Sequence, residues 1–213
     1  MGRRALRKLD PSLDLSPFFF ELDDLSPPLD LSAFFACAAP LEIEVGSGKG
    51  LFLANAAVEH TDRNFLGIEL ARKYASFSAA RLAKRELENA KVICGDAIRI
   101  FGEFLPSQAA AAVHVYFPDP WWKKRHRKRR VLQADFVKDI ERVLTRRGKL
   151  HFWTDVEEYF QDAVELMRGA AMLTGPHAVV ELEAAHDLDY RTHFERRVRL
   201  GEQPVYRAEF QKV

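Results

Sequence analysis

The chain has 213 residues, of which 47% are hydrophobic and 30% are charged, and its formal net charge is +1 at pH 7. This length suits one folded domain with extensions, and the near-neutral charge excludes a uniformly basic nucleic-acid-coating protein. No apolar run approaches the roughly 18 residues of a membrane-spanning helix, so we expect no membrane partner. The two cysteines, Cys37 and Cys94, lack metal-ligand spacing, so we expect no metal site and a reduced, cytoplasmic setting.

The first forty residues differ in composition from the rest of the chain. A short basic arm, within residues 3–8, is followed by no apolar segment, which argues against a secretory signal. Residues 9–40 then carry six acidic residues, several prolines and no Lys or Arg. We predict that residues 1–40 form an N-terminal arm, partly extended or disordered and partly docked by its aromatic residues, and that residues 41–213 form the folded domain.

From residue 41 onward, strand patterns alternate with helix patterns. Apolar and β-branched runs predict strands over residues 41–45, 64–69, 91–94, 111–117, 149–154, 179–183 and 205–211. Amphipathic periods predict helices over residues 50–58, 71–88, 131–144 and 156–170. This alternation predicts an α/β fold, with a mostly parallel sheet covered by helices on both faces. Ligands of such sheets bind beyond the carboxyl ends of the strands.

The first of these strands runs into a glycine-rich turn, Gly46-Ser47-Gly48-Lys49-Gly50. Alternate glycines let the backbone approach a ligand closely, and the following helix offers free N–H groups. The spacing excludes a phosphate loop, because Ile43 stands where that motif needs its first glycine. A dinucleotide fingerprint would place the third glycine one residue later.

Three acidic residues surround this turn. Glu69 ends the second strand, where an acid can accept hydrogen bonds from ribose hydroxyls, and Asp96 follows the third strand, where it can accept from an adenine amino group. Glu44 precedes the turn and can face a cationic group. This acidic ring disfavours a pyrophosphate and favours S-adenosylmethionine. Glu69 and Asp96 could instead cap the helices that follow, and Lys49 could contact a cofactor carboxylate or face solvent.

Asp119 lies between two prolines directly after the strand at 111–117, so its direction is largely fixed. Trp121 and Trp122 follow, and then seven of the eight residues at 123–130 are Lys or Arg. Without these seven cations the chain would carry a net charge of −6, so its positive charge is concentrated as a phosphate-binding footprint requires. A solvated charge run is the alternative interpretation.

The residue types around Asp119 favour chemistry on a nucleic-acid base. A carboxylate matches the N1–H and N2–H₂ donors of guanine, and either indole could stack on an unpaired base or belong to the core. Asp155 is a second carboxylate at the same predicted sheet edge, with helix capping as its alternative role. Residues 191–197 mix hydroxyl, aromatic, acidic and basic side chains in an irregular stretch.

Together these motifs resemble the bacterial tRNA (guanine-N7-)-methyltransferase family, from about residue 41 to the C-terminus. The signature is Phe-Pro-Asp-Pro-Trp at 117–121 with the basic tract at 123–130, and residues 154–155 and 192–195 are similar to later family motifs. Trp122 departs from the His or Pro expected there. The resemblance implies a Rossmann-like class I S-adenosylmethionine-dependent methyltransferase with a seven-stranded, mostly parallel sheet.

The resemblance also implies an activity: methyl transfer from S-adenosylmethionine to N7 of guanosine 46 in the tRNA variable loop, by a monomer or a homodimer. Asp119 would be the catalytic acid beside the cofactor, stabilising positive charge rather than accepting a proton. The cofactor would contact Glu44, Gly46, Gly48, Glu69, Asp96 and Asp119. The tRNA substrate would contact Lys123, Asp155, Thr192, His193, Phe194 and Glu195. The rest of the tract at 123–130 would hold the RNA backbone.

Three other functions are weighed against this one. Another S-adenosylmethionine enzyme would share the glycine turn but act on a different base or a protein side chain. A non-catalytic RNA-binding protein on the same scaffold would not need Glu44, Gly46, Gly48 and Glu69. An NAD-dependent oxidoreductase is disfavoured by the glycine spacing and the acidic ring.

Overall fold

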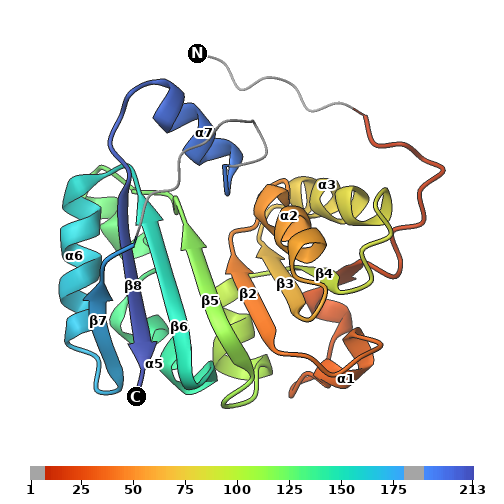
Figure 1. Ribbon diagram of the computed structural model, residues 1–213, viewed down its shortest axis with the longest axis horizontal. Coiled ribbons are helices and arrows are strands. Elements are labelled where there is room, and N and C mark those ends of the chain that lie inside the picture. Colours follow the sequence, from red (N-terminus) through yellow and green to blue (C-terminus); the bar gives the residue numbers. More distant parts are fainter. Residues whose placement is uncertain (1–7, 180–189) are drawn as a thin grey trace.

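The computed structural model describes residues 8–179 and 190–213 (Figure 1). Within these residues, eight strands form one sheet in the order β1-β4-β3-β2-β5-β6-β8-β7, with helices on both faces. Strands β1 to β6 run parallel, whereas β8 is antiparallel to both of its neighbours. The predicted α/β fold is confirmed, with one more strand than the seven expected.

The elements have the following bounds. The strands are β1 Phe19–Glu21, β2 Leu41–Val45, β3 Asn64–Glu69, β4 Ala90–Cys94, β5 Ala110–Tyr116, β6 Leu144–Thr154, β7 Leu173–His177 and β8 Tyr206–Lys212. The α-helices are α1 Leu31–Phe34, α2 Leu51–Glu59, α3 Arg72–Ala83, α4 Ala97–Arg99, α5 Ala134–Val143, α6 Glu157–Arg168 and α7 His193–Leu200. Three short irregular helices are η1 Leu22–Asp24, η2 Ile100–Phe104 and η3 Lys124–Arg129.

The predicted boundaries differ from the structure at several elements. The helix predicted over 71–88 ends at Ala83, because Glu86 adopts a φ of 52° and the Leu87 N–H closes onto the Leu82 carbonyl at 3.2 Å. The strand predicted over 149–154 begins earlier, at Leu144. The strand predicted over 179–183 lies mostly outside the described residues, and β7 ends before it.

The extra strand comes from the N-terminal segment. β1 pairs with β4 at the edge of the sheet, and the Leu29 N–H donates to the Phe104 carbonyl at 2.8 Å. Leu22 packs against Gly95, where a Cβ atom would lie 2.7 Å from that of Leu22. The predicted arm is therefore packed on the sheet from Phe18 to Phe35, while the domain boundary at residue 40 stays a prediction. The rest of the basic arm, residues 1–7, lies outside the described residues.

Two apolar clusters form the core, one on each side of the sheet. The larger cluster joins the sheet to η2, α5 and α6, and the smaller one joins β3 and β4 to α2 and α3. Figure 1 shows α2 and α3 on one face and α5 on the other. This layering leaves the carboxyl ends of the parallel strands as the edge at which connecting loops gather.

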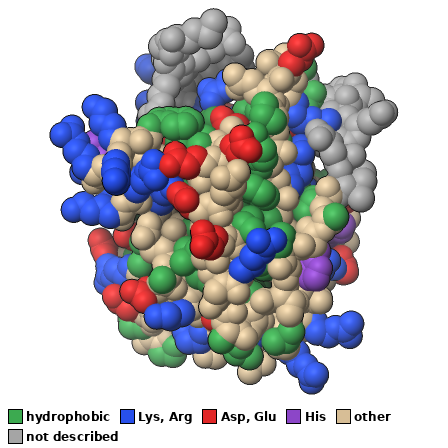
Figure 2. Space-filling view, turned by 90° about the vertical axis from the view of Figure 1, so that its left-hand side faces the viewer, with side chains coloured by type: hydrophobic (Ala, Val, Ile, Leu, Met, Phe, Trp, Pro, Cys, Tyr) green, Lys and Arg blue, Asp and Glu red, His purple; other side chains and the backbone are tan. Residues whose placement is uncertain are grey.

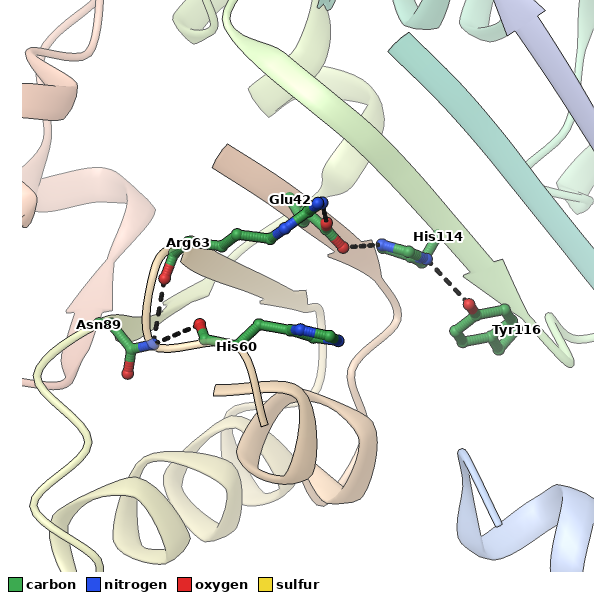
Figure 3. A network of polar contacts seen from close by, with 6 residues as sticks. All are labelled: Glu42, His60, Arg63, Asn89, His114 and Tyr116. Atoms are coloured by element: carbon green, nitrogen blue, oxygen red, sulfur yellow. Dashed lines mark hydrogen bonds and ion pairs between the residues drawn. The ribbon is translucent and has the colours of Figure 1, made fainter. Parts of the chain in front are cut away.

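A polar network crosses the middle of the sheet (Figure 3). Glu42 of β2 pairs with Arg63 and accepts from His114 Nε2 at 2.8 Å, while His114 Nδ1 lies 2.8 Å from the Tyr116 hydroxyl. Burial by itself would raise the pKa of Glu42, but hydrogen bonds from His114 and Arg63 outweigh it and lower the pKa to about 2. Burial lowers the pKa of His114. In its neutral form, which burial favours, His114 can donate to Glu42 from Nε2 and accept from the Tyr116 hydroxyl at Nδ1.

We expect Glu42→Gln to lower the free energy of unfolding at pH 7 by about 2 kcal/mol. The pKa shift alone would give a larger loss, but Arg63 is partly exposed and solvent screens its charge. The folded pKa of Glu42 lies below its ordinary value of 4.5, so this stabilisation is present above that pH and is lost toward about pH 2. Denaturant unfolding at pH 7 and at pH 3 measures it. If the parent and the variant differ in free energy of unfolding by the same amount at both pH values, Glu42 is not the group that titrates.

Candidate active site at the carboxyl ends of the strands

The glycine turn after β2 forms a cradle open on one side. Gly46 and Gly48 have φ angles of 76° and 55°, in the left-handed region that disfavours side chains. The Gly46 and Ser47 N–H groups both donate to the Ile68 carbonyl, at 2.8 and 3.0 Å, which ties the turn to β3. A Cβ atom added to Gly46 would meet nothing within 4 Å. The turn therefore leaves room for a ligand to approach its backbone.

A cavity of about 720 Å³ lies over this turn, beyond the carboxyl ends of the strands from β4 to β5. Its volume is in the range of sites for small molecules and cofactors. Most predicted site residues line it: Glu44, Gly46, Gly48, Glu69, Asp96, Asp119, Thr192, His193 and Phe194. Lys123, Asp155 and Glu195 lie outside this lining.

Glu44 is the most unusual acid of the site. Its side chain is buried, and within the described part of the chain its Oε2 atom has no hydrogen-bond partner. Burial, and secondly the charge of Glu69, raise the pKa of Glu44 well above its ordinary value. The Glu44 carboxylate accepts a backbone hydrogen bond from Leu53, but its Oε2 atom is left without one beside the open cradle, which suits a ligand that brings a cationic group.

Glu69 and Asp96 combine structural contacts with a place on the cavity wall. Glu69 accepts from the Gly48 and Ala71 N–H groups, both at 2.8 Å. Asp96 caps α4 by accepting from the Ile98 N–H at 2.9 Å, so the capping alternative applies to it. Each carboxylate retains lone pairs that can accept from a ligand. The acidic ring therefore fits a ligand that carries hydroxyl and amino donors.

Asp119 is exposed, on a loop with a strained backbone. Phe117 and Trp121, at the two ends of the loop, have φ angles of 49° and 46°, which non-glycine residues rarely adopt. The Phe117 N–H donates to the Trp153 carbonyl at 2.8 Å, and the Phe117 ring stacks on Phe194 with centroids 5.0 Å apart. Proline spacing predicted a fixed direction for Asp119, but nothing in the sequence pattern predicted this strain.

Neither indole after Asp119 is buried, so the core interpretation is wrong for both. Trp121 is half-buried and lines the cavity, with the Arg129 guanidinium 5.1 Å from its ring centroid. Trp122 is 67% exposed. Both aromatic surfaces are therefore within reach of a large planar ligand, Trp121 from inside the cavity and Trp122 from outside it.

The basic tract is an ordered helical turn, η3, and not an unstructured charge run. Figure 2 shows Lys and Arg side chains gathered at an upper edge of the molecule. Two members differ from the expectation that the whole tract binds RNA. Arg127 pairs with Glu158 of α6, and Arg130 is buried and pairs with Asp162 of α6 at 2.7 Å. The expectation is wrong for Arg130, because its charge is covered.

The second loop at the cavity is the start of α7. Thr192 caps this helix by accepting from the Glu195 N–H at 2.9 Å, and it lines the cavity with His193 and Phe194. Glu195 is only 3% exposed; it accepts from the Arg191 N–H at 2.7 Å and contacts Arg207 at 3.3 Å. Glu195 is therefore not accessible to a ligand, and its contacts hold α7 in place.

Asp155 is half-buried at the carboxyl end of β6. The helix that follows begins without a side-chain cap, and its Val156 N–H is bound by the Thr154 hydroxyl at 3.2 Å. Helix capping is therefore not the role of Asp155. The cavity also contains residues that sequence reasoning missed, among them Tyr74 and Tyr116. Tyr116 directly precedes the motif that carries Asp119, whereas no pattern singled out Tyr74 as a site residue.

The described residues, 8–179 and 190–213, hold neither a metal-binding cluster nor a membrane-spanning helix. Among them, no group of three or more His, Cys, Asp or Glu residues is placed to hold a metal ion. None of the helices in this described part of the chain has the length and apolarity needed to cross a membrane.

Comparisons with known proteins place the chain among relatives. A family model described as a putative methyltransferase matches residues 38–208. A protein of Rhodopirellula baltica named tRNA (guanine-N(7)-)-methyltransferase is 49% identical over 100% of this chain and 80% of its own length. A protein of the same name from Geobacter metallireducens is 36% identical, covering 84% of this chain and 87% of its own.

Solved structures support the fold. A SAM-dependent methyltransferase from Aquifex aeolicus superposes with a TM-score of 0.58 at 14% identity, covering 82% of each chain. The antibiotic-resistance methyltransferase Kmr gives a TM-score of 0.57 at 18% identity, covering 86% of this chain and 92% of its own. The Rossmann-like methyltransferase fold is thereby confirmed.

We expect Glu44→Gln to raise the free energy of unfolding of the ligand-free protein at pH 8 by about 1–2 kcal/mol, because an amide carries no charge for burial to disfavour. The pKa of Glu44 is raised above 4.5, so the cost of ionisation is absent below that pH and grows as the pH rises. Denaturant unfolding should therefore give similar stabilities at pH 5 and a more stable variant at pH 8. A variant less stable than the parent at pH 8 would refute this.

Proposed function

Since the chain belongs to the tRNA (guanine-N(7)-)-methyltransferase family, we propose that it methylates guanosine 46 in the variable loop of tRNA. The chain is an enzyme that transfers a methyl group from S-adenosylmethionine to N7 of guanine in tRNA. The choice of position 46 rests on the resemblance to the family, which implies it. We place the reaction in the cytoplasm, where its tRNA substrate would be met. One observation carries the proposal: the glycine cradle with Glu44 and the exposed Asp119 face the same cavity.

The residues of the cradle fit the methyl donor. S-adenosylmethionine supplies an electrophilic methyl group on a sulfonium, and it also carries an ammonium group, a ribose and an adenine. Glu44 would stabilise the cationic part, because the Oε2 atom of its buried carboxylate has no hydrogen-bond partner among the described residues. Gly46 and Gly48 would let the backbone approach the cofactor closely. Glu69 would accept from ribose hydroxyls and Asp96 from the adenine amino group.

Asp119 would orient the guanine and stabilise charge. Guanine N7 has a free lone pair, so no base has to remove a proton from it. Methylation at N7 makes the purine cationic and its N1–H more acidic. A carboxylate bound to N1–H and N2–H₂ therefore gains strength as the reaction proceeds, which stabilises the transition state more than the ground state. The strained backbone and flanking prolines keep the Asp119 carboxylate in one direction.

The remaining surface would hold the RNA. Lys123, Lys124, Arg125 and Lys128 are exposed beside the cavity, where they can contact phosphates. A guanine has to leave its stack to reach the cavity, and Trp121 and Phe194 offer aromatic surfaces on its wall. Asp155, Thr192 and His193 would complete the substrate contacts. Glu195 would act indirectly, by holding α7.

Methyl transfer from labelled cofactor to an unmodified tRNA transcript tests the proposed position. The matched control is the same transcript with adenosine in place of the variable-loop guanosine. We expect label in the first RNA, recovered as 7-methylguanosine after digestion to nucleosides, and background in the second. Equal labelling of both RNAs would refute position 46, whereas 7-methylguanosine in neither would refute the function.

Asp119→Asn is expected to lower kcat by about 10²–10³-fold, because the amide presents a donor to the donors of guanine and loses the charge. The dissociation constant for S-adenosylmethionine should stay within about threefold, since remote contacts hold the cofactor. Asp135→Asn is a matched control, because Asp135 is an exposed acid at the start of α5 that pairs with Lys138 on the surface. A near-native kcat for Asp119→Asn would show that Asp119 does not stabilise the transition state.

A further inference from the structure

Arg130 differs from every other cation of the basic tract in its burial. It is 5% exposed, and its guanidinium lies 4.4 Å from the centre of the Tyr159 ring. Burying a guanidinium is costly unless its charge is paired and its N–H groups are bound. Here Nη1 donates to Asp162 of α6 at 2.7 Å, so the buried guanidinium is paired with a half-exposed carboxylate. A covered and paired cation offers nothing to an RNA phosphate.

The other arm of the same guanidinium reaches the loop that carries Asp119. Arg130 Nε donates to the Pro120 carbonyl at 2.9 Å. Pro120 stands between Asp119 and Trp121, and as a proline it has no N–H, so its carbonyl is the group through which its backbone can be held. Trp121 has a φ of 46°, and a strained residue keeps its conformation only when its surroundings hold it.

Arg127 provides an internal comparison. It pairs with Glu158, one helical turn before Asp162 on α6, so two arginines three residues apart match two acids four residues apart. Both arginines therefore dock the tract on α6. Of the two, Arg130 is the one with a bond to the loop at 117–121.

We propose that Arg130 is a positioning residue for methyl transfer: it braces the Asp119 loop against α6 and does not bind RNA. This inference rests on the proposed role of Asp119. The geometry requires an arginine, because its planar fork donates in two directions at once. A lysine at position 130 can keep the ion pair with Asp162, but it cannot also hold the Pro120 carbonyl in the same geometry.

The test compares Arg130→Lys with the matched variant Arg127→Lys, using the full chain, tRNA and S-adenosylmethionine. Arg130→Lys should lower kcat by about 10²-fold, because a displacement of about 1 Å at the reacting centre has that effect. Its KM for tRNA and the salt dependence of that KM should stay within about twofold of the parent values. Arg127→Lys should keep kcat. Lys128→Ala, at an exposed member of the tract, should instead raise the KM for tRNA and weaken its salt dependence.

The split between kcat and KM decides the outcome. A raised KM for tRNA with native kcat in Arg130→Lys would make Arg130 an RNA contact and overturn the inference. Equal losses of kcat in both Arg→Lys variants would assign the effect to docking on α6 and also overturn it. Should Arg130→Lys fail to fold in thermal unfolding, Asp162→Asn replaces it, since it loosens the anchor and leaves Arg130. A lowered kcat with native KM in that variant supports the brace, and an unchanged kcat overturns it.

These outcomes are separate from a failure of the proposed function. If the parent enzyme does not methylate tRNA, the function is wrong before any variant is compared. If the parent is active and Asp119→Asn is inactive while Arg130→Lys retains full kcat, the function stands and the brace is wrong.

Discussion

The parallel pairing of the strands from β4 to β6 is the constraint on which the site depends. Parallel strands end at the same edge of a sheet, so the loops after β2, β3, β4 and β5 meet there although they are far apart in the chain. This edge brings Glu44, Glu69 and Asp96 to one cavity with Asp119. α7 lines the same cavity from a later part of the chain, held there by the contact of Glu195 with Arg207 of β8.

Charge is divided among distinct tasks around this edge. On the cofactor side, burial and the charge of Glu69 raise the pKa of Glu44. Ionising this buried carboxyl lowers the stability of the fold, and a cationic ligand would offset that loss. On the RNA side, the exposed members of the tract remain available for phosphates, whereas Arg127 and Arg130 are paired with α6. Within one run of cations, most members therefore face solvent, while Arg130 contacts the loop that carries Asp119. The Glu42 network stabilises the sheet beneath, and it reaches the cavity wall only at Tyr116.

Sequence patterns predicted much of the fold because its elements are locally encoded. The strands at β2 and β3 have the predicted bounds, since short apolar runs between turns are unambiguous there. The end of α3 at Ala83 depended on a backbone turn at Glu86 that residue types do not specify. β1 was missed because an edge strand of three residues acquires its structure from pairing with β4.

The sequence by itself determined which residue types can perform the chemistry: the glycine turn, the three acids, the proline-flanked Asp119 and the concentrated cations. Motif and spacing carry that information because each depends on neighbours along the chain. Only the tertiary structure decided which cations face solvent and which acids are accessible. The burial of Arg130 against Tyr159 and Asp162, and of Glu195 against Arg207, arises from contacts between distant segments. Burial and pairing of this kind leave no periodic signal in the sequence, because they depend on how α6, α7 and β8 pack in space.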